Sequence, residues 1–313
     1  MELMAGGMPG LSARTRLMVV APHPDDETLA AGLLIQQVAA AGGAVRVLLL
    51  TDGDNNPWPQ RWLERRWRIG AAERQRWGRR RREESAAALD RLGLHASCLE
   101  ALGWPDMGVT ARLRDEAAAS VDLLRSAIER FGPDLVVIPS LDDRHPDHGA
   151  AHVLCRLALA GGSVPAAGWR TYLVHGRRRE PGGAVENPGE PRERRRKLEA
   201  LEAYASQTAL SGGRLRRLAA RPERYLDEAA PSPRPGCLPW RPPAPWQPFL
   251  RLMVAGPAGV SDTPWRQAPL DREADGAYRL DAEACGRGSP CFAKLYMDIH
   301  SPWIFDRWGW CRL

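Results

Sequence analysis

The chain has 313 residues, of which 44% are hydrophobic, and a formal net charge of +6. Its length allows one large domain, or one domain with an appendage, and its apolar content can form a sizeable core. No apolar run approaches the roughly 20 residues needed to cross a bilayer, and the start lacks the pattern of a signal peptide. We therefore expect a cytoplasmic protein, with contact at the inner face of the membrane left open.

Strand and helix patterns alternate through the first two thirds of the chain. Short apolar runs predict buried strands, and apolar residues repeating every three or four positions predict helices between them. This alternation predicts an α/β fold: a Rossmann-like, doubly wound and mostly parallel sheet. The expected strands are 17–21, 45–51, 97–102, 135–139 and 169–175, and the expected helices are 29–38, 60–92, 113–128, 148–160 and 191–207.

The chain changes character near residue 229. Residues 231–248 are dense in proline, which indicates a stiff linker or an irregular cover. Strands are expected at 249–255 and 292–299, and residues 302–310 are unusually aromatic. The tryptophans near the end are interpreted as core or cover residues, and the alternative is a rim that stacks on sugars or rests on lipid headgroups. We expect a main domain at 13–228 and a Pro/Trp-rich extension of unassigned fold at 229–313.

The isolated cysteines and histidines carry little information. The six cysteines form no CxxC pair, which argues against a structural zinc ribbon. Cys285 and Cys291 could pair, but in a reducing compartment we expect free thiols. His175 and His300 are expected to be ordinary polar residues.

Two histidine–aspartate motifs each follow a predicted strand. The first is PHPDDE at residues 22–27, and the second is RHPDH at residues 144–148. If the preceding strands are parallel neighbours, both motifs meet at the carboxyl edge of one sheet, where open α/β folds place their ligands. Either motif alone could be a polar helix start. Both together favour a metal centre.

These residues suit a catalytic zinc site, which has three protein ligands and one open position. His23 and Asp26 can face one point from a single turn, and His148 supplies the third ligand. Asp25 lies beside a ligand and is the natural general base for an activated water. His145 could stabilise charge on an attacked carbonyl or protonate a leaving amine.

The paired motifs closely resemble those of the PIG-L/LmbE-like N-deacetylases, over roughly residues 15–210. The resemblance implies a hydrolase that uses one divalent metal ion, usually Zn²⁺, to remove acetyl groups from N-acetylglucosaminyl compounds. It implies the same ligands and base, and makes Asp147 the carboxylate that orients His145. It also places Arg82 and Asp106 on the substrate-binding side.

One feature departs from the family pattern. Some members have a tyrosine just before the second motif that assists the oxyanion, whereas residues 141–144 here read LDDR. That role is therefore unassigned.

Three functions remain open. The leading one is deacetylation of an N-acetylated amino sugar in a glycolipid, envelope polysaccharide or related glycoconjugate, anionic or lipid-linked. The second is amide hydrolysis of a thiol conjugate or an N-acylated antibiotic by the same site. The third is a glycan- or membrane-binding protein without catalysis, which the complete motif set argues against. The sequence does not indicate an oligomeric state.

An arginine-rich stretch lies outside the family pattern. Residues 61–82 contain ten arginines, with Trp62, Trp67 and Trp77 among them. The first interpretation is a solvated helix that packs its tryptophans on the core. The second is contact with the phosphate or carboxylate groups of a glycolipid, sugar nucleotide or membrane surface. Nucleic-acid binding is the least favoured, because no recognition motif accompanies the stretch.

Overall fold

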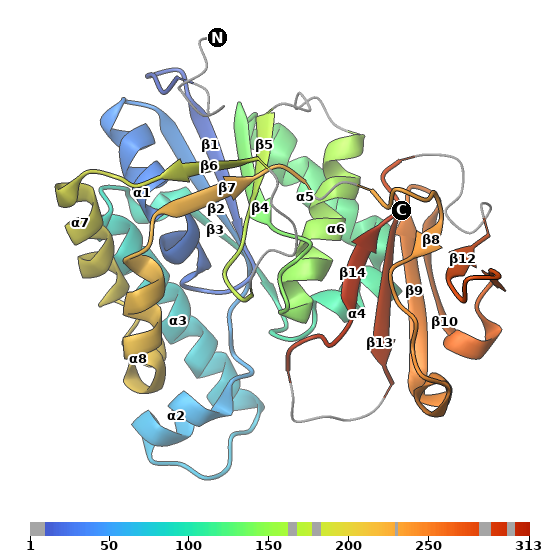
Figure 1. Cartoon of the computed structure of the whole chain (residues 1–313). Helices are drawn as coiled ribbons and strands as arrows, with labels where there is room; N and C mark the ends of the chain where they lie inside the picture. Colours follow the sequence, from blue (N-terminus) through green and yellow to red (C-terminus); the bar gives the residue numbers. More distant parts are fainter. Residues whose placement is uncertain (1–9, 162–167, 177–182, 229–230, 282–288, 299–303) are drawn as a thin grey trace.

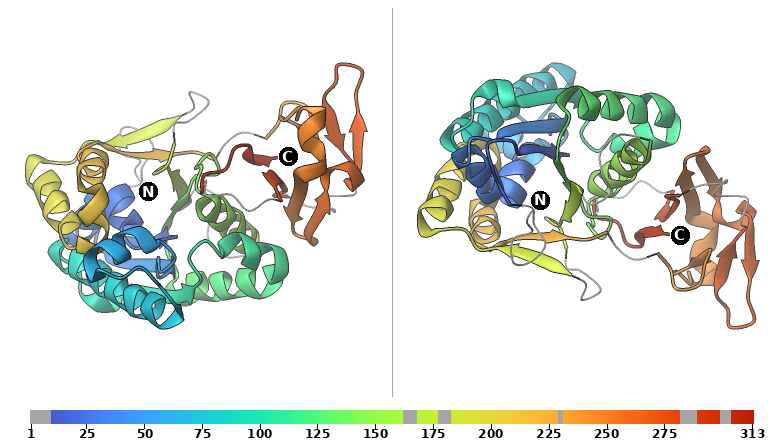
Figure 2. Two further views of the ribbon diagram at one scale, coloured as in Figure 1. Left: turned by 90° about the horizontal axis from the view of Figure 1, so that it is seen from below. Right: turned by 90° about the horizontal axis from the view of Figure 1, so that it is seen from above.

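A computed structural model describes the chain except residues 1–9, 162–167, 177–182, 229–230, 282–288 and 299–303. A seven-stranded sheet lies between helices, and two smaller sheets from the C-terminal extension stand beside it (Figures 1 and 2). The strands of the main sheet are β1 (Arg16–Ala21), β2 (Ala44–Thr51), β3 (Leu99–Trp104), β4 (Leu135–Pro139), β5 (Trp169–Tyr172), β6 (Ala184–Asn187) and β7 (Glu223–Leu226). The helices are α1 (Asp26–Ala40), α2 (Pro57–Glu64), α3 (Ala71–Arg91), α4 (Val109–Asp115), α5 (Ala117–Phe131), α6 (Pro146–Ala160), α7 (Pro191–Leu201) and α8 (Ala205–Ala219).

The main sheet has the strand order β3-β2-β1-β4-β5-β7-β6. The first five strands run parallel, and β7 pairs antiparallel with both β5 and β6. Chain order reverses between β1 and β4, where Leu17 pairs with Leu135 and Val19 with Val137. The predicted Rossmann-like α/β fold is confirmed, and the two motif-bearing strands are neighbours at its switch point.

Successive side chains of the buried strands point to opposite faces of the sheet, so that an apolar core forms on each face. In β1, Leu17 and Val19 face the core formed with α1, α3, α7 and α8, whereas Met18 and Val20 face the core formed with α4, α5 and α6. This two-residue period explains why continuous apolar runs form strands that are buried on both faces.

Three predicted helices each divide into two. The helix expected at 113–128 is broken at Glu116, between α4 and α5. The expected helix at 60–92 ends early because Arg65 adopts a left-handed conformation, with φ of 51°. A second helix, α3, starts after Gly70, whose amide donates to Glu73 Oε2 at 3.1 Å. The expected helix at 191–207 ends at Leu201, and α8 begins near Ser206, whose amide donates to Glu84 of α3. Tertiary contacts decide these breaks, which periodicity does not reveal.

A buried ion pair lies against the middle of α1. Lys197 Nζ and Glu223 Oε1 are 2.6 Å apart, and Lys197 donates to Leu29 O at 2.8 Å. The Glu223 carboxylate accepts from the amides of Leu33 and Leu34 at 2.7 and 3.1 Å. Side chains of α7 and β7 therefore bond to backbone groups within the helix that follows the first motif.

The C-terminal extension folds into antiparallel sheets. One has the order β10-β9-β13-β14 and the other β11-β12-β8. The strands predicted at 249–255 and 292–299 are confirmed as β9 and β13. The extension comprises β8 (Cys237–Leu238), β9 (Leu250–Gly256), β10 (Gly259–Pro264), β11 (Leu270–Arg272), β12 (Tyr278–Leu280), β13 (Phe292–Met297) and β14 (Gly309–Arg312).

The extension shares a core with the main sheet. Met253, Ala255, Phe292 and Trp310 belong to the same apolar cluster as α6. Trp310 lies so close to Gly149 that a Cβ there would be 2.4 Å from the indole ring. The interpretation of the terminal tryptophans as core residues is thus confirmed for Trp310. A residue larger than glycine at position 149 would collide with its indole ring.

Cysteine chemistry differs from the expectation in one place. Cys98, Cys155, Cys237 and Cys311 are free thiols, but Cys291 is disulfide-bonded. Cys285 lies outside the described residues. The expectation of free thiols was wrong for Cys291 because it rested on the compartment rather than on geometry. No helix in the described ranges is both long and apolar enough to cross a membrane.

Candidate metal and catalytic centre

The two motifs occupy the carboxyl ends of adjacent strands. The first forms the turn between β1 and α1, in which the His23 amide donates to Asp26 Oδ2 at 2.9 Å. The second begins α6, where His145 is the N-cap residue and its Nδ1 accepts from the Asp147 amide at 3.3 Å. Parallel pairing of β1 with β4 brings these two helix starts together.

Three nitrogen and oxygen atoms converge as the sequence predicts. His148 Nε2 lies 3.1 Å from Asp26 Oδ2 and 3.3 Å from His23 Nδ1, and these last two atoms are 3.4 Å apart from each other. Zinc bonds of about 2.0–2.1 Å in tetrahedral geometry place ligand atoms roughly 3.3–3.4 Å apart. The triangle of His23, Asp26 and His148 therefore has the dimensions of three zinc ligands.

The second nitrogen of each histidine faces a carboxylate. His148 Nδ1 is 3.1 Å from Asp143 Oδ2, and His23 Nε2 lies 3.4 Å from Asp147 Oδ2 and 3.3 Å from Asp106 Oδ1. Such partners fix the ring orientation and tautomer of histidines that bind metals. The arrangement thus supports both rings as ligands through their other nitrogens.

Asp147 differs from its expected role. The family resemblance makes it the partner of His145, but its carboxylate lies on His23 and accepts from the amides of Met107 and Val109 at 2.7 and 3.2 Å. The reason is that these amides near the start of α4 hold the carboxylate on the side of His23. Asp147 therefore connects the second motif to the first.

Asp143 was missed by the sequence analysis. Its Oδ2 accepts from the amides of Val174 and His175 at 3.0 and 2.9 Å, and its Oδ1 accepts from the His145 amide at 2.9 Å. Burial alone would raise the pKa of Asp143, but His148 lowers it below its usual range. The LDDR segment, which lacks the tyrosine found in some family members, thus supplies the carboxylate that contacts His148. No signal in the motif itself points to it.

Electrostatics indicate that the triangle favours a cation. Burial alone would lower the pKa of His148, but Asp143 and Asp26 raise it to about 10. The carboxylates of Asp106 and Asp147 add negative charge around His23. A divalent ion would supply the positive charge that protons on these rings otherwise provide, so the residues present fit a metal ion.

Asp25 has an unusual backbone and a perturbed carboxyl. Its φ of 112° is rare for a non-glycine residue and marks local strain. The turn is held by Glu27, which accepts from the Asp25 amide at 3.1 Å and from Tyr204 Oη at 2.6 Å. Burial and the charge of Asp26 raise the pKa of Asp25 to about 8, whereas Arg81 opposes the rise. Asp25 thus combines the strain and perturbed pKa common at functional sites.

The site opens into a cavity of about 490 Å³. His23, Asp25 and Asp26 line it together with His145 and His175. Ile304 and Phe305 of the extension complete the lining, so a segment far along the chain borders the predicted metal ligands.

His175 belongs to this site, contrary to its expected role as an ordinary polar residue. Its ring centroid is 4.9 Å from that of His148, and its Nδ1 lies 3.1 Å from Arg214 Nη2. Burial is the main cause that lowers the pKa of His175 to about 4. The sequence signal for His175 was weak because this histidine stands alone after β5. His300 lies outside the described residues.

The two predicted substrate-binding residues lie in different places. Asp106 lines the cavity and contacts His23, as a site residue would. Arg82 pairs with Asp52 at 3.4 Å and is outside the cavity lining. Its neighbour Arg81 is buried in that lining, where it donates to Gly53 O and Pro24 O at 2.6 and 2.8 Å.

Part of the chain matches a known protein family. Residues 18–159 match the family model described as PIG-L, GlcNAc-PI de-N-acetylase. This part of the chain is therefore similar to the PIG-L family. The match includes the second motif, His145 to His148, and β1 to α6 of the fold.

Proteins with similar sequences are named as deacetylases. A 1D-myo-inositol 2-acetamido-2-deoxy-α-D-glucopyranoside deacetylase of Mycolicibacterium gilvum is 33% identical over 168 residues, covering 50% of this chain and 56% of that protein. The enzyme of the same name from Rhodococcus erythropolis is 32% identical over 179 residues, which cover 50% of this chain and 58% of that protein. The chain thus spans little more than half the length of these relatives.

Solved structures share the fold of the main domain. The deacetylase of the A40926 pseudoaglycone is 25% identical with a TM-score of 0.54, covering 69% of this chain and 99% of that one. A triple mutant of a deacetylase of the teicoplanin biosynthetic pathway is 26% identical, with a TM-score of 0.52. The likeness covers 68% of this chain and 97% of that one.

Proposed function

We propose that the chain is a metal-dependent hydrolase that removes the acetyl group from an N-acetylated amino sugar. The observation that carries the proposal is the triangle of His23, Asp26 and His148 beside the strained Asp25. The likeness of residues 18–159 to the PIG-L family model and the names of the similar proteins support the reaction class. The intact constellation argues against a binding protein without catalysis.

His23, Asp26 and His148 would hold the ion, and Zn²⁺ suits this set of two imidazoles and one carboxylate. When bound, the ion polarises an amide carbonyl and lowers the pKa of a water molecule. Asp143 and Asp147 keep the two imidazoles oriented through their other nitrogens.

Asp25 acts as the general base in this proposal. A water oxygen forms a bond to the acetyl carbon while Asp25 takes one of its protons. The C–N bond then breaks, and Asp25 returns that proton to the leaving nitrogen. The products are the free amine and acetic acid, which keeps the second proton of the water and then releases it to become acetate, so atoms and charge balance. The site at the strand ends keeps Asp25 buried, which disfavours its charged form and strengthens it as a base.

His145 stabilises the developing oxyanion rather than acting as the acid. A backbone amide can only donate, so the contact with the Asp147 amide makes His145 Nδ1 an acceptor. In the neutral ring, the proton then resides on Nε2, which can donate a hydrogen bond to the attacked carbonyl oxygen. Burial, followed by the charge of His23, lowers the pKa of His145 well below its usual value and supports the neutral form.

A second candidate is deacylation of an N-acylated glycopeptide antibiotic. The likeness to the A40926 pseudoaglycone deacetylase over 99% of that chain favours it. Acetate release from a GlcNAc-inositol compound, compared with release of the acyl group from a glycopeptide, distinguishes the two. Both share the chemistry proposed for Asp25.

Asp25→Asn tests the mechanism. The variant should keep its metal, because Asp25 is outside the triangle, and should lower kcat by about 100-fold or more. Metal content by atomic emission and acetate release measure the two effects. His148→Ala is the matched comparison, in which metal occupancy and activity should fall together. Loss of metal in Asp25→Asn would make Asp25 a ligand, and unchanged kcat would remove it as the base.

A further inference from the structure

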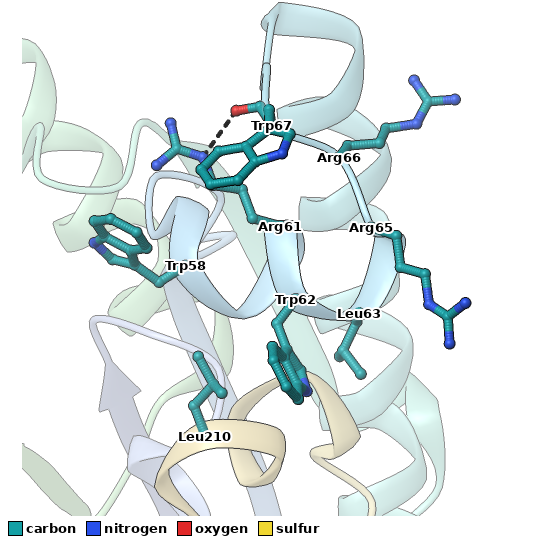
Figure 3. A pocket seen from close by; sticks show the side chains of 8 residues that line it. All are labelled: Trp58, Arg61, Trp62, Leu63, Arg65, Arg66, Trp67 and Leu210. Atoms are coloured by element: carbon teal, nitrogen blue, oxygen red, sulfur yellow. Dashed lines mark hydrogen bonds between the residues drawn. The ribbon is translucent and has the colours of Figure 1, made fainter.

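A second surface feature lies away from the predicted metal ligands, on and around α2 (Figure 3). Three tryptophans there are largely exposed: Trp58 by 65%, Trp62 by 68% and Trp67 by 87%. Together with neighbouring arginines and leucines they surround a shallow cavity of about 760 Å³. We call this set the tryptophan–arginine patch: Trp58, Arg61, Trp62, Leu63, Arg65, Arg66, Trp67 and Leu210.

The patch overturns the leading interpretation of the arginine-rich stretch. Of the tryptophans considered there, only Trp77 is buried in the core, whereas Trp62 and Trp67 face solvent. The break between α2 and α3 explains the difference, because it turns α2 away from the face on which Trp77 packs. Exposed apolar groups of this size on one surface mark an interaction site.

The charge of the patch is positive. Arg65 and Arg66 extend outward on the side of the view opposite Trp58 (Figure 3). Arg61 donates to Trp67 O at 3.0 Å, and its guanidinium lies 5.0 Å from the Trp58 ring centroid. Arg66 contacts Glu73 at 3.1 Å, which compensates one of the three charges. Tryptophans framed by arginines match an anionic lipid surface, because indole rings favour the headgroup level and guanidinium groups favour phosphate.

The patch is continuous with the candidate active site. Trp58 lines both the 760 Å³ cavity and the 490 Å³ cavity that contains the predicted metal ligands. Helix α2 also lies at an extremity of the molecule, below α3 and α8 in Figure 1. A flat surface could therefore reach the patch without colliding with the main sheet.

We propose that the tryptophan–arginine patch docks the protein on a bilayer that contains anionic lipids. Resting on the proposed function, this placement presents the catalytic cavity to an N-acetylated amino sugar attached to a lipid. A patch that joins a protein partner would need no anionic lipid, so lipid dependence separates the two cases.

Vesicle sedimentation tests the proposal without any enzyme assay. The full chain is mixed with vesicles of phosphatidylcholine alone or with 30% phosphatidylglycerol added, at about 50 mM and 500 mM salt. We expect binding to the anionic vesicles at low salt and weaker binding at high salt, since exposed charges are screened. Trp62→Ala/Trp67→Ala should weaken binding at least tenfold. Arg65→Gln/Arg66→Gln should weaken it by about tenfold on anionic vesicles, since each basic group near such a surface contributes about a factor of five and Arg66 is partly compensated.

Matched controls lie elsewhere on the surface. Phe249→Ala removes an apolar side chain that is 52% exposed in the extension, and Arg192→Gln/Arg195→Gln removes exposed charges from α7. Both should bind vesicles as the parent does. Circular dichroism confirms folding, since Trp62 and Trp67 have little buried area to lose. Equal binding of parent and patch variants would overturn the proposal, as would no binding of the parent. Concentration-dependent self-association that the tryptophan variant abolishes without lipid would instead make the patch an interface between copies.

Discussion

Asp143 acts on the site through the orientation of another residue. Its contact with His148 Nδ1 leaves Nε2 directed at Asp26 and His23. Asp143→Asn should therefore lower metal affinity by about 10- to 100-fold, the usual effect of losing such a partner. Competition with a chelator measures the affinity. Asp142→Asn is the neighbouring control with no contact to His148, and equal losses in the two variants would contradict the assignment.

Binding of the metal should release protons. In the metal-free protein the pKa of His148 is about 10, so its imidazole is protonated at pH 7 and must lose a proton to become a ligand. Apparent affinity should then rise with pH between about 6 and 9. Calorimetry in buffers of different ionisation enthalpy counts the protons released. Asp143→Asn should reduce the number because it removes the main charge that raises the pKa, and metal binding without proton release at pH 7 would refute the argument.

At this scale the sequence predicts where the candidate ligands lie better than where their partners lie. His23, Asp26 and His148 stand in two compact motifs, each at the end of a predicted strand, and this placement is what brings them together. Asp143 and His175 have no such spacing, because their positions depend on how the loops after β4 and β5 meet. A directional contact between two loops cannot be read from either loop alone.

The helix α1 depends on a partner that the local sequence does not contain. Lys197 and Glu223 are both buried, and they bond to backbone groups of α1. Lys197→Met should destabilise the fold by about 3–5 kcal/mol, because Glu223 would remain as an unpaired buried charge. Urea unfolding measures the change.

The double variant Lys197→Met/Glu223→Gln provides the control for this pair. It should recover part of the loss, since no buried charge is left unpaired. The argument fails if Lys197→Met lowers the free energy of unfolding by less than about 1 kcal/mol. It also fails if the double variant loses more stability than Lys197→Met and Glu223→Gln lose together. The periodicity of 29–38 predicts α1, but nothing in that periodicity predicts the ion pair.

At the scale of the whole molecule, the extension supports the main domain. Trp310 from β14 fills the space over Gly149 at the start of α6. Trp310→Ala should destabilise the protein by about 3–5 kcal/mol through the cavity it leaves. Thermal or urea unfolding measures this loss, with Phe249→Ala as an exposed control expected within about 0.5 kcal/mol. A loss near zero for Trp310→Ala would show that the extension is an independent appendage.

The sequence predicts the main sheet well and the extension poorly. Alternation of strands and helices predicts a parallel sheet, because each helix carries the chain back across it, but it predicts neither the strand order nor the antiparallel strands β6 and β7. The extension consists of short antiparallel strands separated by proline-rich segments, and only β9 and β13 have apolar runs that mark them. Its contact with α6 requires Gly149, directly after the second motif, to match a tryptophan roughly 160 residues later, and no local pattern connects the two.

That separation has a consequence for biosynthesis. A ribosome adding about 5–20 residues per second needs roughly 8–32 s to pass from Gly149 to Trp310. During this interval β1, β4 and the predicted metal ligands have already been made, while the face of α6 that receives β14 has no cover. The nascent chain therefore exposes apolar surface beside the candidate metal ligands, and it is most prone to aggregate in that interval.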